Sequence, residues 1–171
     1  MRVLISGGAK NGKSTFAENL IVKLKGEDEL FYLATMIPHD KEDLERIRRH
    51  KEERKDKEFI TIECGENISS LVLKYDGAYL LDSITALLSN EMFKENKINL
   101  DAGKKVLRDL INLSTRVKNI VFVSDYIYSD ANRYDKYSEK YRENLAYIDR
   151  ELAKVCDKVY EVSFGNLKEH K

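Results

Sequence analysis

Short apolar stretches alternate with longer amphipathic stretches along the whole chain. The apolar stretches are rich in Val, Ile, Leu and Tyr and have the length of buried strands. Six strands are expected, at Arg2–Ser6, Leu30–Ala34, Phe59–Glu63, Tyr79–Asp82, Asn119–Ser124 and Lys158–Ser163. Six helices are expected between them, at Lys13–Lys25, Lys41–Lys57, Ile68–Tyr75, Thr85–Lys94, Asp101–Arg116 and Tyr137–Cys156.

This alternation predicts βαβ units, and therefore an α/β fold with a mainly parallel sheet and helices on both faces. Hydrophobic residues make up 42% and charged residues 35% of the chain, which is typical of a globular protein. No repeat, low-complexity linker or shift of composition marks a boundary. We therefore expect one domain over residues 1–171.

Composition also excludes several classes of protein. The 30 basic residues are matched by 30 acidic ones, so no excess positive charge points to a nucleic-acid partner. The longest apolar runs, such as IVFV at 120–123, are far too short to span a membrane. No secretory signal is expected, and Cys64 and Cys156 lack metal-type spacing. A cytoplasmic protein with reduced cysteines is the simplest interpretation.

The segment GGAKNGKST follows the first expected strand and opens the first expected helix. It fits the phosphate-loop pattern G-x-x-x-x-G-K-[ST], in which backbone N–H groups and a helix N-terminus surround phosphate oxygens. We expect Lys13 to reach the β and γ phosphates of GTP or ATP, and the Ser14 hydroxyl to bind Mg²⁺. The fold is thus expected to resemble P-loop NTPases, and the expected nucleotide-binding loop comprises Gly7, Gly8, Ala9, Lys10, Asn11, Gly12, Lys13, Ser14 and Thr15.

A phosphate loop also needs a carboxylate for its metal at the end of another buried strand. Asp82 ends the apolar run in AYLLDSIT and is the expected second Mg²⁺ ligand, close to the nucleotide. The same stretch reads as a helix start, so Asp82 is alternatively a cap of the next helix.

The segment ERIRRHKEERK, residues 45–55, holds one of the three histidines in a run of charges. At about 100° per residue, Arg46, His50 and Arg54 fall on one face of the expected helix. Two flanking guanidinium groups favour an uncharged, nucleophilic imidazole, and they can also hold a triphosphate. A solvent-exposed helix face on which His50 has no function fits the same periodicity, so the pattern alone leaves both interpretations open.

The stretches GGAKNGKS, YLAT, DKEDLERIRRHKEER, FITIE and LLDSIT occur in this order in the first half of the chain. Together they resemble the bifunctional adenosylcobinamide kinase / adenosylcobinamide-phosphate guanylyltransferase family of cobalamin assembly. That family shows a GGxxxGKS loop, then D-x-E-x-x-x-R-I-x-x-H-x-x-x-R, then an aromatic-x-T-x-E stretch. The matching positions here are Asp40, Glu42, Arg46, Ile47, His50, Arg54, Phe59, Thr61 and Glu63, and Asn90 matches an asparagine after the acidic strand.

The resemblance implies two reactions. The first phosphorylates the aminopropanol hydroxyl of adenosylcobinamide, and the second moves GMP from GTP onto that phosphate through a histidine that carries covalent GMP. His50 matches that histidine, so His50 and Lys13 are the expected catalytic residues, and Arg46, Arg54 and Glu63 join the expected nucleotide-binding set. A corrinoid acceptor, Mg²⁺ and a trimer are also implied.

The second half of the chain departs from the family pattern. VSDYIY at 123–128 stands where the family reads V-[ST]-N-E-V-G, and YRENLAYIDR at 141–150 stands for F-R-D-x-x-G-x-x-N-Q. Arg142 is kept. Six of the ten tyrosines lie within residues 126–147. They either form a flat surface that binds a corrin or a base, or pack against the sheet or a neighbouring subunit. Two alternatives therefore stand beside the bifunctional enzyme: a relative with one reaction or another acceptor, and a non-catalytic nucleotide-binding regulatory protein.

Overall fold

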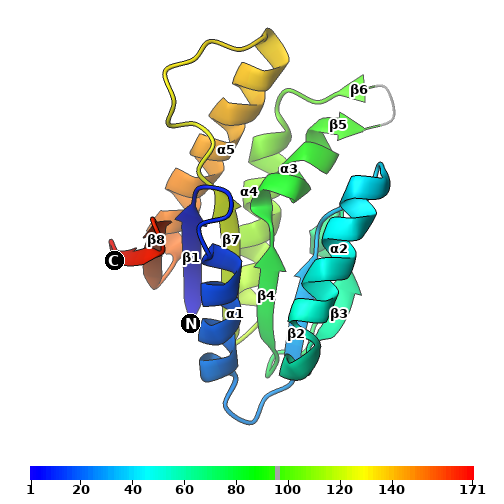
Figure 1. Ribbon diagram of the computed structural model, residues 1–171, viewed down its shortest axis with the longest axis vertical. Coiled ribbons are helices and arrows are strands. Elements are labelled where there is room, and N and C mark those ends of the chain that lie inside the picture. The colour runs from blue at the N-terminus through cyan, green and yellow to red at the C-terminus, as the bar shows by residue number, and fades with distance from the viewer. Residues whose placement is uncertain (95–96) are drawn as a thin grey trace.

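The computed structural model describes residues 1–94 and 97–171. Its centre is a seven-stranded sheet in the order β3-β2-β4-β7-β1-β8-β9, and a separate two-stranded pair joins β5 to β6 (Figure 1). The strands are β1 (Arg2–Gly7), β2 (Leu30–Ala34), β3 (Ile60–Glu63), β4 (Ala78–Asp82), β5 (Phe93–Lys94), β6 (Lys97–Ile98), β7 (Asn119–Asp125), β8 (Lys158–Ser163) and β9 (Asn166–Glu169). The helices are α1 (Lys13–Lys25), α2 (Lys41–Glu53), α3 (Ile84–Met92), α4 (Ala102–Thr115) and α5 (Lys136–Val155).

Neighbouring strands of the large sheet run parallel, except for the pair of β8 and β9. The prediction of an α/β fold with a mainly parallel sheet is therefore confirmed. Parallel strands bring their carboxyl ends to one edge, where ligands of such sheets bind. The register pairs Gly7 with Asp125 and Ala34 with both Glu63 and Asp82, so these strand ends lie side by side.

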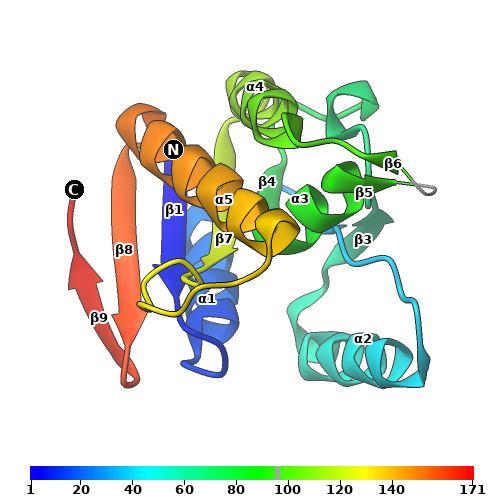
Figure 2. The same ribbon diagram turned by 90° about the horizontal axis from the view of Figure 1, so that it is seen from above.

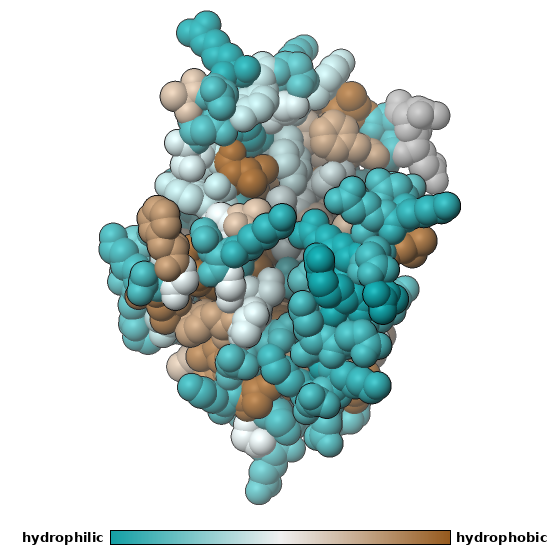
Figure 3. All heavy atoms as spheres, in the orientation of Figure 1, coloured by the Kyte–Doolittle hydropathy of each residue, from teal (hydrophilic) through white to brown (hydrophobic). Residues whose placement is uncertain are grey.

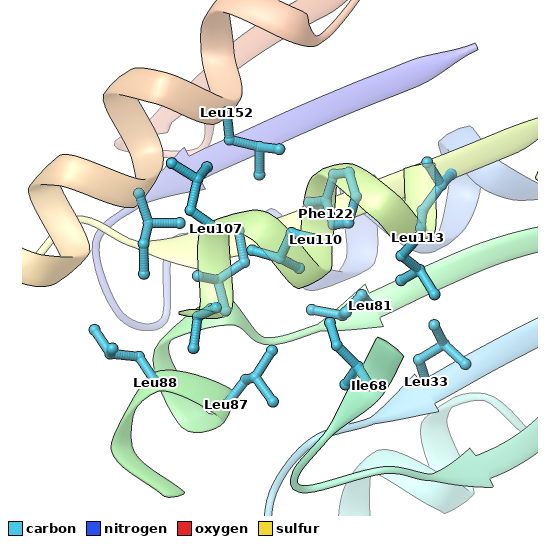
Figure 4. Close-up of a cluster of buried hydrophobic side chains, with 14 of the residues drawn as sticks. Leu33, Ile68, Leu81, Leu87, Leu88, Leu107, Leu110, Leu113, Phe122 and Leu152 are labelled. Carbon is cyan, nitrogen blue, oxygen red and sulfur yellow. The ribbon is translucent and has the colours of Figure 1, made fainter. Parts of the chain in front are cut away.

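Helices cover both faces of this sheet, as predicted. Figure 2 shows α1 and α2 on one side and α3, α4 and α5 on the other. Side chains alternate along each strand, so Val3 and Ile5 pack on the α1 side, whereas Leu4 packs on the opposite side. The larger core lies beneath α3, α4 and α5 and is dominated by leucines (Figure 4).

Helix α2 differs from the others because none of its residues is buried. Its surface is hydrophilic in Figure 3. The helix begins at the N-cap Asp40, whose carboxylate accepts a hydrogen bond from Asp43 N at 2.8 Å. It ends at Glu53 rather than Lys57, where a short 3₁₀ turn (Lys55–Lys57) and a left-handed Glu58 (φ 57°) redirect the chain into β3.

Other elements also differ from the sequence-based expectation, and the short strands β5 and β6 were not predicted. The helix predicted over Ile68–Tyr75 is only a 3₁₀ turn at Ile68–Ser70, because Leu71 already has extended backbone angles and the Arg116 guanidinium binds the carbonyls of this turn. The helix predicted to reach Lys94 ends at Met92. Strand β9 was not predicted, because its four exposed residues at a sheet edge show no alternation of apolar and polar side chains.

No helix within residues 1–94 and 97–171 combines the length and the apolar character needed to cross a membrane.

One carboxylate is buried between α5 and the sheet. Asp149 is 5% exposed, and its Oδ2 accepts hydrogen bonds from Ser124 Oγ and Tyr128 Oη, both at 2.9 Å. Burial raises the pKa of this carboxyl from its ordinary 3.8 to about 6, against the opposing effect of the two hydrogen bonds. The folded protein therefore binds a proton at Asp149 more tightly than the unfolded chain does.

This raised pKa predicts a pH-dependent stability. Because the folded state holds the extra proton, the free energy of unfolding should fall as the pH rises from about 4 to about 6, by roughly 3 kcal/mol from this group. The variant Asp149→Asn, which cannot titrate, should lose this component. Urea unfolding of both proteins between pH 4 and 7 measures the difference, and parallel pH curves for the two would contradict the prediction.

Candidate active site

A cleft of about 500 Å³ opens at the carboxyl edge of the sheet, between the start of α1 and the inner side of α2. Its wall includes seven of the residues that the sequence singled out: Lys13, Ser14, Arg46, His50, Arg54, Glu63 and Asp82. The cleft therefore gathers residues from four separate parts of the chain. The loop residues 7–12 and Thr15 are not part of this wall and lie in and beside the turn that leads into α1.

The phosphate loop joins β1 to α1, which is the context that its sequence pattern requires. Gly12 has φ 83° and Lys10 has φ 60°, so the chain turns through two left-handed residues before the helix. A Cβ at Gly7 would lie 2.5 Å from the carbonyl oxygen of Val162 on β8, so only glycine fits there. The N-cap of α1 is Gly12, which has no side chain to cap the helix, so the first N–H groups are left to phosphate oxygens.

Lys13 is the first residue of α1 and is largely buried. Its Nζ lies 2.6 Å from Asp125 Oδ1 and 3.2 Å from the carbonyl oxygen of Gly8. Asp125 was not among the residues predicted from the sequence, although it ends the buried run NIVFVSD just as Asp82 ends AYLLD. The same criterion, an acidic residue that closes a buried strand, identifies both carboxylates.

Asp82 ends β4 and lines the cleft. It accepts a hydrogen bond from Tyr32 Oη at 3.0 Å, and burial together with this neighbouring carboxylate raises the pKa of Tyr32 well above its ordinary value. The alternative that Asp82 caps α3 is wrong, because the cap is Ser83, whose Oγ accepts a hydrogen bond from Ala86 N at 3.2 Å. The Asp82 carboxylate is thus available to the cleft.

Buried hydrogen bonds fix the backbone around Asp82. Thr35 Oγ1 accepts a bond from Ser83 N at 2.7 Å and donates one to Ser83 O at 2.8 Å. Asn90, which the sequence comparison also singled out, donates from Nδ2 to the carbonyls of Thr35 and Gly65, both at 2.8 Å. Asn90 therefore ties the segments that follow β2 and β3 to α3, and Thr35 ties the end of β2 to the end of β4.

His50 lies in the last turn of α2 and lines the cleft with its side chain 28% exposed. Arg46, one turn earlier, lies in the same wall, as the helical periodicity predicts. Besides the arginines expected from the sequence, His50 has an acidic neighbour, Glu53, whose Oε2 lies 3.7 Å from His50 Nδ1. The imidazole therefore faces the cleft from the side opposite the phosphate loop.

Arg54 follows the last residue of α2 and is 6% exposed. Its guanidinium carbon lies 3.5 Å from the centre of the Tyr32 ring, a cation–π contact. Its Nη1 is buried without a hydrogen-bond partner in the described part of the chain. Tyr32 thus connects Arg54 to Asp82, and an anionic ligand in the cleft would supply the acceptor that Nη1 lacks.

Glu63 ends β3 at the rim of the cleft, where its side chain is 80% exposed and pairs with Lys51 Nζ at 3.5 Å. Such an exposed pair contributes little to stability.

The oxygen donors in the cleft fit Mg²⁺. The Ser14 hydroxyl and the Asp82 carboxylate both line it, and Mg²⁺ usually takes one or two protein oxygens together with water and substrate phosphates. Within residues 1–94 and 97–171, no group of three or more His, Cys, Asp or Glu side chains is arranged to hold a metal ion. Ser14 and Asp82 would therefore share the ion with a bound nucleotide.

The tyrosine-rich segment divides into partly buried and exposed side chains. Tyr141 donates to the carbonyl of Thr85 at 2.8 Å and lines the cleft, whereas Tyr126, Tyr134 and Tyr137 are exposed. Arg142 fastens the preceding loop to α5 through the carbonyls of residues 130 and 132. Packing against the larger core explains the partly buried tyrosines, Tyr128, Tyr141 and Tyr147. Of the exposed ones, Tyr134 lines a second pocket that shares Tyr141 with the cleft.

Comparison with known proteins identifies the family. The family model described as "Cobinamide kinase / cobinamide phosphate guanyltransferase" matches residues 3–168. The chain belongs to this family. The match includes the divergent second half, so the departures there are variation within the family. The phosphate loop, Asp82 and His50 all lie within the matched range.

Individual relatives agree with this assignment. The chain is 27% identical over 179 residues to the "Bifunctional adenosylcobalamin biosynthesis protein CobU" of Salmonella typhimurium, a match that covers 96% of this chain and 97% of the relative. It is 30% identical over 96 residues to the protein of the same description from Escherichia coli, over 54% of this chain and 51% of the relative.

Solved structures support the fold alone. The flagellar accessory protein FlaH from Methanocaldococcus jannaschii superposes with a TM-score of 0.54 at 15% identity, over 98% of this chain and 75% of that one. A solved ATPase domain gives a TM-score of 0.50 at 14% identity, over 94% of this chain and 68% of that one. The prediction of a P-loop NTPase-like fold is confirmed.

Proposed function

We propose that this cleft carries out two transfers: phosphorylation of the aminopropanol hydroxyl of adenosylcobinamide, and transfer of GMP from GTP to the resulting phosphate through His50. The observation that carries the proposal is the meeting of a phosphate loop, a strand-end carboxylate and a histidine in one cleft. A protein that only binds nucleotide needs the first two groups but has no use for the histidine.

The first transfer requires the γ phosphate of a triphosphate to lie against the loop. The N–H groups at the start of α1 and the ammonium of Lys13 would hold the β and γ phosphates. Ser14 and Asp82 would hold Mg²⁺, which supplies charge neutralisation for the phosphates when it is bound. The acceptor hydroxyl attacks the γ phosphorus and releases its proton to solvent, the bond to the β-phosphate oxygen breaks, and the nucleoside diphosphate leaves.

The second transfer uses the opposite wall of the cleft. An imidazole nitrogen of His50 attacks the α phosphorus of GTP, an N–P bond forms, and pyrophosphate leaves. An oxygen of the acceptor phosphate then attacks the same phosphorus and releases His50. Arg46 and Arg54, which line the same wall, would hold the phosphates during the attack, and the unpartnered Nη1 of Arg54 in the described part of the chain supports that role.

Incubation with GTP labelled at the α phosphate tests the second transfer directly. The protein alone should retain the label covalently, and added adenosylcobinamide phosphate should discharge it into a soluble product. A relative with only the kinase reaction would show acceptor phosphorylation without a protein adduct. The homo-oligomeric state, a trimer by resemblance, is checked by sedimentation of the same sample.

A metal role for Asp82 predicts a clear phenotype. Asp82→Asn should raise the Mg²⁺ concentration needed for phosphoryl transfer by about tenfold or more, because a neutral amide is a poor ligand for a hard cation. The amide oxygen can still accept the hydrogen bond from Tyr32, so the fold should persist. A Mg²⁺ titration of the kinase reaction provides the measurement, and a curve that overlays the wild type would exclude Asp82 as a ligand.

A further inference from the structure

Lys13 carries an internal counter-ion that the function proposed above does not use. The distance from Lys13 Nζ to Asp125 Oδ1 is 2.6 Å, and the two side chains are only 9% and 20% exposed. A close ion pair with so little exposure is screened by water much less than a surface pair is. The lysine that should meet the nucleotide phosphates therefore already has an anionic partner.

The sheet holds Asp125 in this place. Asp125 is the last residue of β7 and is paired in register with Gly7, the first residue of the phosphate loop. Its backbone N–H donates to Thr85 Oγ1 at 2.9 Å, and the next N–H, that of Tyr126, donates to the carbonyl of Gly7 at 3.0 Å. These two bonds hold the backbone of Asp125 in place beside the phosphate loop, so the carboxylate can move only by rotation of its own side chain.

A bound triphosphate and Asp125 compete for the same ammonium group. We propose that Asp125 is an exchangeable counter-ion of Lys13 that sets the phosphate specificity of the loop. A ligand that replaces the carboxylate must offset the loss of this ion pair with further contacts, such as those of a phosphate chain with the N–H groups at the start of α1. Nucleoside di- and triphosphates are therefore favoured over monophosphates and inorganic phosphate. The inference rests on the nucleotide-binding part of the proposed function and requires neither transfer reaction.

The surrounding charges are consistent with this role. Other cations of the cleft, Arg46, Lys51 and Arg54, come from α2 and the residue that follows it. Lys13 stands on the opposite side and is paired with the strand-end carboxylate of Asp125, and a second strand-end carboxylate, Asp82, lines the same cleft. Without Asp125, Lys13 would be a partly buried cation that attracts any small anion.

Calorimetric titrations with GTP and with inorganic phosphate test the exchange in four proteins: wild type, Asp125→Asn, Lys13→Ala and the double variant. With Lys13 present, Asp125→Asn should tighten GTP binding by about tenfold, which is the order expected for the loss of one close competing charge pair. It should also make binding of inorganic phosphate measurable. In the Lys13→Ala background, the same substitution should change GTP binding much less.

An equal gain in GTP affinity from Asp125→Asn in the wild-type and Lys13→Ala backgrounds would mean that Asp125 only repels phosphate. That result would overturn the proposed exchange. Unchanged or weaker GTP binding by Asp125→Asn would overturn it as well. If Asp125 had only a structural role, Asp125→Asn would have a lower melting temperature than the wild type and an unaltered affinity for GTP. Thermal unfolding of both proteins is therefore measured in parallel, with and without GTP.

Asp125→Glu keeps the charge and should bind GTP within about twofold of the wild type, well inside the tenfold effect. Should Asp125→Asn fold poorly, the comparison rests on Asp125→Glu and Asp125→Ser. A wild-type protein that binds neither GTP nor ATP would overturn the proposed function and this inference together. If the wild type binds GTP and no substitution of Asp125 changes that affinity, only this inference is overturned.

Discussion

Replacing His50 by Asn is expected to abolish the covalent attachment of GMP while phosphoryl transfer continues. His50 lines the wall of the cleft formed by α2, whereas the phosphate loop that serves the kinase reaction lies across from it. The asparagine side chain resembles the histidine side chain as far as the ring atoms bonded to Cγ, but its amide nitrogen is not nucleophilic. Because γ-phosphoryl transfer to a hydroxyl needs no covalent enzyme intermediate, the kinase reaction should retain its rate within about threefold.

The measurement uses GTP labelled at either the α or the γ phosphate. The α label should remain on the wild-type protein in a linkage that is labile in acid and comparatively stable in base, as a phosphoramidate is. The γ label should leave with pyrophosphate. His39 is exposed and does not line the cleft, so His39→Asn is a matched control that should label normally. An adduct of undiminished amount in His50→Asn would assign the nucleophile to another residue.

The second large effect is expected for Lys13→Ala. The substitution removes the ammonium group that the loop presents at the start of α1, and phosphoryl transfer should fall by at least about a hundredfold. GTP should still bind, more weakly, because the N–H groups at the start of α1 remain. Steady-state kinetics of acceptor phosphorylation together with calorimetry separate the two effects.

The control for this variant lies on the same helix. Lys23 is an exposed lysine near the other end of α1, so Lys23→Ala changes the same residue type and net charge without touching the cleft. Its turnover should match the wild type. The fold of Lys13→Ala is checked by its melting temperature, and a folded protein with wild-type kinase turnover would refute the role of the loop.

Local chemistry explains why much of the fold was predictable. Buried parallel strands are continuous apolar runs, and all six predicted strands occur as β1, β2, β3, β4, β7 and β8, with bounds within about two residues. The phosphate loop was predictable because its glycines, lysine and serine act through backbone turns and a helix start that are consecutive in sequence. The helical period of about 3.6 residues likewise placed Arg46 and His50 on the cleft side of one helix.

Other features depend on contacts between segments distant in the chain, and the sequence carries no local signal for them. The stretch after Ile68 is held by Arg116 rather than by its own helical bonds, and β9 exists only because β8 offers an edge. The choice of Ser83 over Asp82 as helix cap was decided by how β4 enters α3.

The chemistry of the site divides in the same way. The sequence by itself determined which residues can bind phosphate or act as a nucleophile, because those properties belong to the side chains and their local spacing. Only the tertiary structure decided their partners: the pairing of β1 with β7 puts Asp125 against Lys13, and the pairing of β2 with β4 puts Tyr32 between Asp82 and Arg54. Strand order is set by burial across the whole sheet, so these partners become neighbours only when the chain has folded.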